Sequence, residues 1–327
     1  MAILPVMRLY RHYADLPRSA RGAVLAIGNF DGLHRGHQTV IRAAREAAAA
    51  QGCPHGVLTF EPHPRLVFRP DQPPFRLTPF RSKARLLEEM GIDLLYVLRF
   101  APPLYRLPAE DFVRRVLVEG LGVRHVVVGD NFHFGAKRGG TPESLRRMGG
   151  AQGFGVTVIE RLGDGSAAVS STEIRQLLVA GDMRSAARLL GRPWEIDGRV
   201  LHGAKRGREL NMPTANIDLG GMLRPAYGVF AVEAAIDAGP APAWRPGVAN
   251  LGISPMFSYA KPLLEVHLLD FSGDLYGRQL RVRLIERLRP EMTFDGLPAL
   301  MAQMQEDARR ARSVLGVPPL VAGAEGD

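Results

Sequence analysis

The chain has 327 residues, 46% of them hydrophobic and 23% charged, and a formal net charge of +9, which favours a soluble protein of two domains. Residues 1–13 lack the apolar core of a signal peptide and no later stretch is apolar enough to span a bilayer, while the single cysteine, Cys53, excludes an internal disulfide and favours a cytoplasmic location. Arginine supplies nearly all of the basic excess and is spread along the chain without a basic run, so we expect neither a nucleic-acid nor a membrane partner.

In the first half of the chain, expected strands alternate with expected helices. Strands are expected over 24–27, 56–60, 94–98, 125–129 and 156–159. Helices are expected over 38–50, 79–91, 109–119, 172–180 and 183–190 and after Pro142. We expect Thr78 to be the N-cap of the helix over 79–91. This alternation predicts βαβ units with a parallel sheet, in which ligands bind outside the carboxyl ends of the strands.

The most informative motif is Gly28-Asn29-Phe30-Asp31-Gly32-Leu33-His34-Arg35-Gly36-His37, between the first expected strand and an alanine-rich helix. A glycine-rich turn before a helix leaves backbone N–H groups free to hold phosphate oxygens. His34 and His37 can both donate hydrogen bonds to phosphate. Two histidines that bracket a glycine at such a turn resemble the H-x-G-H signature of nucleotidylyltransferases. The alternative is an ordinary turn whose histidines cap the helix.

Three other segments of the first half are unusual. Residues 60–64 and 130–135 each follow an expected strand, so they should lie at the same edge of the sheet as the histidine motif. Residues 170–175 place hydroxyl groups and Arg175 at the start of a helix. Alone, this last segment is typical of a plain capped helix. Beside the histidine motif it fits a phosphoryl-transfer site, which needs cations and N–H donors around the leaving group.

The pattern changes after residues 191–193. Short alternating strands follow, joined by turns rich in glycine and proline, and one helix over 297–315 closes the pattern. The strands are expected over 194–201, 215–219, 227–236, 247–251, 263–271 and 279–288. Such a series predicts an antiparallel barrel or sandwich. We therefore expect domains over 1–190 and 191–316 and a disordered tail over 317–327.

The second half has its own candidate site. A cationic loop over 203–208 precedes Thr214 and Asn216, whose side-chain oxygens suit a hard cation and its phosphates. Alternation along a later strand puts Glu265 on the face opposite Leu264. Taken alone, a carboxylate on a barrel strand is typical of a solvated surface group.

Over nearly its whole length the chain resembles the bifunctional riboflavin kinase/FAD synthetase family. The matching segments are 28–37, 59–64, 129–135 and 170–175 in the first half, and 213–216, 227–230, 247–252 and 265–277 in the second. Two segments depart from the family pattern: Leu210-Asn211-Met212 where Leu-Gly is usual, and Ser254-Pro255-Met256 where Arg-Pro-Thr is common. Asparagine is the best non-glycine residue for a left-handed backbone, so we expect the first change to be tolerated.

The resemblance implies an α/β Rossmann-like nucleotidylyltransferase domain with a parallel sheet, followed by an all-β riboflavin kinase barrel with a C-terminal helix. Riboflavin and ATP would give FMN in the barrel, and FMN and ATP would give FAD and pyrophosphate in the first domain. Mg²⁺ would be the cofactor. The partners would be the small molecules riboflavin, FMN and ATP, and the chain would be a monomer or a weak homo-oligomer.

The resemblance also implies residue roles. Adenylyl transfer would use His34, His37 and Arg175. ATP and FMN would be bound there by Gly28, Phe30, Asp31, Gly36, Pro62, Asn131, Phe134, Ser171 and Thr172. In the kinase Glu265 would be the base. ATP and flavin would be bound by Gly203, Lys205, Gly207, Pro213 and Asn250, with Thr214 and Asn216 on the metal.

Two rival functions are considered. One is a kinase whose first domain has become a scaffold, against which the intact histidine pair argues. The other is a flavin- or nucleic-acid-binding regulator without chemistry, which predicts salt-sensitive nucleic-acid binding and no consumption of ATP.

Overall fold

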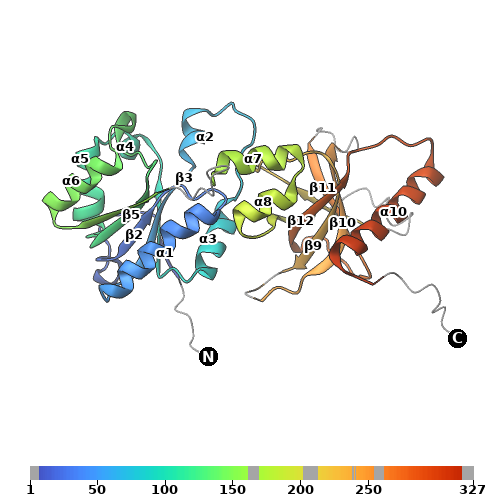
Figure 1. The fold of residues 1–327 in the computed structure, drawn as a ribbon, viewed down its shortest axis with the longest axis horizontal. Helices are drawn as coiled ribbons and strands as arrows, with labels where there is room; N and C mark the ends of the chain where they lie inside the picture. The colour runs from blue at the N-terminus through green and yellow to red at the C-terminus, as the bar shows by residue number, and fades with distance from the viewer. Residues whose placement is uncertain are drawn as a thin grey trace. The chain divides into compact units, whose positions relative to one another are not determined.

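The computed structural model describes residues 7–160, 169–201, 213–237, 239, 241–253 and 261–318. The chain forms two compact units, Met1–Pro73 with Thr78–Ser171 and Pro74–Leu77 with Thr172–Asp327. In Figure 1 the first unit runs from blue to green and most of the second from yellow-green to red.

The first unit contains a six-stranded parallel sheet in the order β1-β4-β3-β2-β5-β6. The strands are β1 (Arg8–Tyr10), β2 (Val24–Ile27), β3 (His55–Glu61), β4 (Leu94–Arg99), β5 (His125–Gly129) and β6 (Gly155–Ile159). The chain proceeds from β2 to β3 and β4 on one side and reaches β5 and β6 on the other. The strand order therefore reverses between β2 and β5, which is where open α/β sheets form their binding crevice.

Helices cover both faces of this sheet (Figure 1). They are α1 (Arg35–Ala50), α2 (Pro64–Phe68), α3 (Phe80–Glu89), α4 (Pro102–Tyr105), α5 (Ala109–Asp111), the π-helix η2 (Phe112–Gly120), α6 (Pro142–Gln152) and the 3₁₀ turns η1 (Arg18–Ala20) and η3 (Ala136–Arg138). Val24 and Ala26 join a core with α1 and α3, and Leu25 and Ile27 join another with η2 and α6. Strands buried on both faces read as continuous apolar runs, and this confirms the parallel sheet.

The sequence prediction differs from the structure in a few elements of the first unit. β1, α2 and α4 were not expected, because each is short and carries too little periodicity to register. The helix expected over 109–119 is instead one turn of α-helix, α5, that continues as the π-helix η2. Local sequence gives no signal for a change of hydrogen-bond register inside a helix.

The second unit is a nearly closed antiparallel barrel, and its described residues include the helices α7, α8 and α10. Its strands are β7 (Trp194–Arg199), β8 (Ala215–Asp218), β9 (Gly228–Ile236), β10 (Arg245–Ile253), β11 (Pro262–Leu268) and β12 (Gln279–Arg289), in the order β7-β12-β9-β10-β11-β8. A bridge from Leu201 to Asn216 joins the two ends of this order. The helices α7 (Ser171–Ala180) and α8 (Met183–Leu190) add Ile174, Leu178 and Leu190 to the barrel core.

Helix α10 (Leu297–Leu315) lies on β9, β10 and β12 and is tied to the barrel by a buried ion pair. Arg289 donates to both carboxylate oxygens of Asp307, with the closest approach at 2.7 Å, and the Asp307 side chain is only 3% exposed. The tail expected over 317–327 lies outside the described residues from 319 onward. None of the helices in the described ranges combines the length and apolarity needed to cross a membrane.

Asp307→Ala should lower the free energy of unfolding of the barrel by about 3 kcal/mol, because it leaves the Arg289 guanidinium buried without its partner. Both tryptophans of the chain, Trp194 and Trp244, belong to the barrel unit, so denaturant unfolding followed by tryptophan fluorescence reports on it. Glu306→Ala is the matched control, because its pair with Arg309 is exposed and such pairs contribute less than about 1 kcal/mol. Equal losses in the two variants would contradict the prediction.

Candidate active sites

The loop between β2 and α1 holds the histidine motif, and His34 is the N-cap of α1. Its backbone is extended, with φ −66° and ψ 170°, and its Nδ1 atom accepts a hydrogen bond from the backbone N–H of His37 at 3.3 Å. A ring nitrogen that accepts carries no proton, so in the neutral ring the proton is on Nε2. The capping alternative is therefore correct for one ring atom of His34, while the other ring nitrogen is a hydrogen-bond donor.

The two histidine rings lie against each other. Their centroids are 3.6 Å apart with the planes 19° from parallel, and the Phe30 ring meets His37 edge-on at 5.3 Å. A Cβ atom on Gly36 would come within 3.2 Å of the His34 ring. Glycine at this position therefore leaves room for the stacked pair beside the N-terminus of α1, where backbone N–H groups favour an anion.

Hydrogen bonds from distant segments hold this loop in place. Gly32 N–H donates to the Thr78 hydroxyl at 3.1 Å, and Thr78 N–H donates to the Asp31 carboxylate at 3.0 Å. The Ser171 hydroxyl donates to the Asp31 carbonyl at 2.9 Å. The prediction that Thr78 caps α3 is wrong, because Pro79 is the N-cap and the Thr78 side chain bonds to the loop instead.

An aromatic cluster, which the sequence did not predict, lies where β3 and β4 end. Phe68 on α2 meets Phe100 at 5.6 Å and Tyr105 at 5.4 Å, and Phe60 meets Phe100 at 6.0 Å, all measured between ring centroids. Phe68 is 63% exposed, which is unusual for so large an apolar side chain. The signal in the sequence was that Phe60 and Phe100 lie at or just beyond the ends of two expected strands.

Pro62 lies between β3 and the α2 turn that bears this cluster. His63, the next residue, is the N-cap of α2, since its Nδ1 accepts from Arg65 N–H at 3.1 Å.

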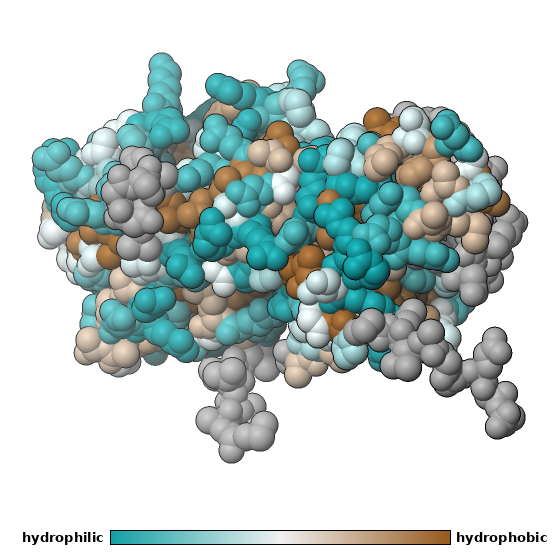
Figure 2. All heavy atoms as spheres, turned by 45° about the vertical axis from the view of Figure 1, so that its right-hand side comes forward, coloured by the Kyte–Doolittle hydropathy of each residue, from teal (hydrophilic) through white to brown (hydrophobic). Residues whose placement is uncertain are grey.

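On the face drawn in Figure 2, hydrophilic side chains cover much of the surface and apolar ones form smaller groups between them.

The loop after β5 belongs to the same edge, because β5 is hydrogen-bonded to β2. Asn131 is exposed there, whereas Phe134 is 6% exposed and stacks on Phe132 at 5.5 Å. Lys137 and Arg138 in the same loop have φ of 54° and 61°, a left-handed backbone that is uncommon for such residues. Asn131 and the histidine pair are thus brought to the strand-order reversal from neighbouring strands.

The remaining residues predicted for adenylyl transfer are divided between the units. Ser171 belongs to the first unit, and Thr172 and Arg175 to the second. Within the second unit, Arg175 Nε donates to the Phe75 carbonyl at 2.9 Å, and its guanidinium lies 5.3 Å from the Phe75 ring centroid. The roles of Thr172 and Arg175 beside the ATP phosphates stay predictions.

In the barrel, three polar residues form a row across neighbouring strands. Glu265 on β11 is directly opposite Asn250 on β10 and directly opposite Asn216 on β8. Directly opposite residues of antiparallel strands project from the same face with Cβ atoms about 5 Å apart. Leu264 and Val266, at most 1% exposed, join the core on the other face, as the alternation predicted.

The surroundings of Glu265 suit a proton acceptor. Burial raises the pKa of its carboxyl group above the ordinary value. His267, two residues further on the same face of β11, is linked through Nδ1 to the Pro213 carbonyl at 3.0 Å. Gly252 lies two residues beyond Asn250, and a Cβ atom there would collide with a carboxylate oxygen of Glu291. Glu291 is therefore a second carboxylate near the row, which sequence reasoning missed.

Thr214 and Asn216 fit an Mg²⁺ ion in the chemistry of their donor atoms. They are two positions apart at the start of β8, so they share a face. A hydroxyl and an amide oxygen suit an ion that keeps several waters and is held mainly by substrate phosphates. Within the described part of the chain, no cluster of three His, Cys, Asp or Glu side chains forms a metal site by itself. Gly203, Lys205, Gly207, Asn211 and 254–256 lie outside the described residues.

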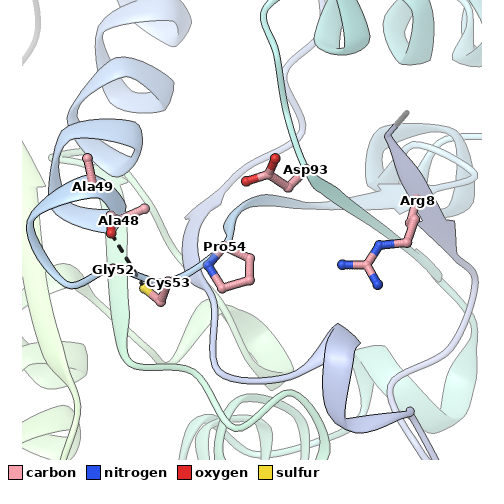
Figure 3. A pocket seen from close by; sticks show the side chains of 7 residues that line it. All are labelled: Arg8, Ala48, Ala49, Gly52, Cys53, Pro54 and Asp93. Atoms are coloured by element: carbon pink, nitrogen blue, oxygen red, sulfur yellow. Dashed lines mark hydrogen bonds between the residues drawn. The ribbon is translucent and has the colours of Figure 1, made fainter. Parts of the chain in front are cut away.

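A pocket of about 440 Å³ lies elsewhere in the first unit (Figure 3). Arg8, Cys53, Pro54 and Asp93 line it together with the end of α1, next to the starts of β1, β3 and β4. This is the amino end of the strands, whereas the histidine loop follows the carboxyl end of β2. The pocket is therefore not part of the candidate site.

Two family models and several curated proteins match the chain. A family model described as FAD synthetase matches residues 16–173, and one described as riboflavin kinase matches residues 190–315. A bifunctional riboflavin kinase/FMN adenylyltransferase of Pseudomonas fluorescens is 45% identical over 309 residues, covering 94% of this chain and 98% of the relative. The protein of the same name from Escherichia coli K12 is 40% identical over 312 residues, covering 95% and 99%.

A solved structure shares the folds of both units. It is titled a macrolide-efflux protein from Streptococcus pneumoniae and superimposes with a TM-score of 0.82 at 29% identity, covering 94% of this chain and 99% of that one. Efflux is the function in that protein's title, and for this chain the similarity supports the parallel sheet followed by the barrel.

Proposed function

Because this chain belongs to the bifunctional riboflavin kinase/FMN adenylyltransferase family, which makes FMN from riboflavin and FAD from FMN, we propose a place for each reaction. Adenylyl transfer occurs at the carboxyl edge of the parallel sheet, between the histidine loop and the aromatic cluster. Phosphorylation occurs on the row Asn216–Glu265–Asn250. The observation that carries the first assignment is the stacked His34–His37 pair at the N-terminus of α1.

Adenylyl transfer needs positioned donors rather than a base. An FMN phosphate oxygen attacks the α-phosphorus of ATP, the bond from that phosphorus to the bridging oxygen breaks, and pyrophosphate leaves. The attacking oxygen is already anionic, so positioning and neutralisation of charge suffice. We assign the phosphates of ATP to His34 Nε2–H, His37 and the first N–H groups of α1, next to Gly28, Phe30, Asp31 and Gly36. Asn131 and Phe134 contact the nucleotide, and Ser171, Thr172 and Arg175 hold the pyrophosphate.

The aromatic cluster and Pro62 suit the flavin ring, which is flat and apolar enough to stack on aromatic side chains. Phe68→Ala should raise the KM for FMN in FAD formation about two- to tenfold, because a stacking contact contributes roughly 0.5–1.5 kcal/mol. Since Phe68 is 63% exposed, the variant should remain folded. Phe68→Tyr keeps the ring and should retain the wild-type KM. An unchanged KM in Phe68→Ala would place the flavin elsewhere.

The kinase reaction differs because its nucleophile is a neutral hydroxyl. Glu265 accepts the proton of the ribityl hydroxyl while that oxygen attacks the γ-phosphorus of ATP and ADP leaves. Asn250 and Pro213 line the site, and Gly203, Lys205 and Gly207 bind the phosphates of ATP. Mg²⁺ on Thr214 and Asn216 would neutralise phosphate charge when bound.

The boundary between the functional domains is proposed near residue 190, with domains 1–190 and 191–316. The match of the riboflavin kinase model from residue 190 supports this boundary, although residues 172–190 group with the barrel by compactness. We also propose a cytoplasmic monomer or weak homo-oligomer that acts on small molecules and not on nucleic acid.

One chromatographic assay tests these assignments. Purified protein is incubated with ATP and Mg²⁺ and either riboflavin or FMN, and the flavins are separated. Riboflavin should give FMN and then FAD, and FMN should give FAD. Chelation of divalent metal should stop both conversions. Conversion of riboflavin without any conversion of FMN would instead support a scaffold role for the first unit.

A further inference from the structure

Lys83 on α3 is a buried cation at the edge of the sheet that carries the histidine loop. Its side chain is 0% exposed, and its Nζ atom lies 2.8 Å from the Asn29 carbonyl oxygen and 3.2 Å from Oε1 of Glu61. The Glu61 side chain is 18% exposed. These two charges have no role in the adenylyl transfer proposed above.

A buried ion pair needs a reason other than stability. Removing an ammonium group and a carboxylate from water is costly, and apolar residues of similar volume are often as stabilising in the same place. A methionine or leucine at position 83 could fill the same space beneath α3. The charged pair provides directional contacts that link two specific backbone segments, and an apolar pair would not provide them.

Those two segments are the loops that carry the two substrates in the proposed function. We call residues 28–34 of the histidine loop the ATP loop and residues 61–68 the flavin loop. Asn29 lies in the histidine loop, and Glu61 ends β3 just before Pro62 and α2, the turn that bears Phe68. The hydroxyl of Thr59 on β3 also approaches the Asn29 carbonyl, at 3.3 Å. One carbonyl of the ATP loop is therefore held by both Lys83 and β3, and Lys83 is held in turn by the start of the flavin loop.

We propose that Lys83 is a positioning residue for adenylyl transfer. Its contacts with Asn29 and Glu61, called the clamp below, fix the ATP loop and the flavin loop relative to one another. The inference rests on the proposed placement of ATP and FMN. Because Lys83 is fully buried it touches neither substrate, and it acts through the loops alone. In-line attack depends steeply on the distance and angle between the reacting atoms, so loss of the clamp should lower kcat more than it raises KM.

Lys83→Met tests the clamp, because methionine is unbranched and close to lysine in volume but has no charge and no donor. We expect kcat for FAD formation from FMN and ATP to fall at least tenfold, with both KM values within about threefold of wild type. Phosphorylation of riboflavin by the same polypeptide should be unchanged, which gives an internal measure of folded, active protein.

Tyr96→Phe is the matched control for a purely structural loss in the same unit. The Tyr96 hydroxyl is fully buried and donates to the Ala20 carbonyl at 2.6 Å, away from both loops. This variant should unfold at a lower temperature than wild type and keep its kcat for FAD formation. Equal kcat in Lys83→Met and wild type, or an equal fall in kcat in Tyr96→Phe, would overturn the inference.

Two further arms keep the test decisive. Where Lys83→Met does not yield folded protein, Glu61→Gln replaces it, since it neutralises the partner of the ammonium group. A severalfold lower kcat with unchanged KM supports the clamp, and an unchanged kcat refutes it. If wild-type protein converts no FMN to FAD, the proposed function of the first unit fails, an outcome separate from failure of the clamp in an active enzyme.

Discussion

His34→Asn should lower FAD formation from FMN at least a hundredfold and leave both folding and riboflavin phosphorylation intact. Asparagine is among the best N-cap residues, so its side-chain oxygen can take over the bond that His34 Nδ1 accepts from His37 N–H. It cannot replace the Nε2–H group, which is the donor proposed for the ATP phosphates. Loss of one such donor typically costs about a hundred- to a thousandfold in rate.

His34→Ala and His37→Ala complete this experiment. Alanine at position 34 removes the cap as well as the donor, so we expect the same loss of FAD formation together with a destabilisation of about 1 kcal/mol. His37→Ala should abolish FAD formation while FMN still accumulates from riboflavin. Thermal unfolding and the two-flavin assay separate these effects. If His34→Asn formed FAD within threefold of the wild-type rate, His34 would act only as the N-cap of α1 and not as a phosphate donor.

Most of the fold could be predicted because most elements carry a local sequence pattern. The apolar run 24–27, the turn glycines after it and the alanine-rich helix are periodic over enough residues to set the type of element. The alternation of strands with helices and then strands with turns is enough to place a parallel sheet before a barrel. The elements that were missed, such as β1 and the π-helix η2, depend on pairing or register, which short sequence windows do not encode.

The candidate sites could be predicted only in part, for the same physical reason. The histidine motif and Glu265 are recognisable because their neighbours in sequence create their setting. Thr78, Lys83 and the aromatic cluster act through contacts with residues tens of positions away, for example Lys83 with Asn29 and Glu61. Thr78 was expected at a helix cap because a threonine before Pro-Phe fits that pattern locally, and only the folded chain brings Gly32 N–H to its hydroxyl.

The two proposed sites contain different side chains because the nucleophiles of the two reactions differ. A phosphate monoester is ionised at neutral pH and needs donors around the phosphates, which the histidine pair and the start of α1 can supply. A hydroxyl must lose a proton as it attacks, and a carboxylate with a raised pKa is a better acceptor at neutral pH than an ordinary one. Of the groups in the barrel row, Glu265 alone is titratable, since Asn216 and Asn250 are amides.

Glu265→Gln should lower FMN formation from riboflavin by about a hundred- to ten-thousandfold, the usual contribution of a general base. Glutamine keeps the size and the hydrogen-bonding geometry of the side chain but cannot accept the proton. FAD formation from added FMN should be unchanged, because His34 and His37 lie in the other unit. Retained phosphorylation of riboflavin would remove Glu265 from the mechanism and leave it a solvated strand residue.

The raised pKa of Glu265 adds two signs that a surface glutamate would not give. Burial raises this pKa above the ordinary 4.5 because it disfavours the ionised carboxylate in the folded state. The carboxyl group therefore favours the folded state at low pH, and this stability is lost as the pH rises through the raised pKa. At neutral pH Glu265→Gln should therefore unfold at the same temperature as wild type or a higher one. In wild type, kcat/KM for riboflavin should fall as pH drops through that raised pKa, because protonation removes the base. The residual activity of the variant should lack this acid limb, and an acid limb that persists unchanged would assign the titration to another group.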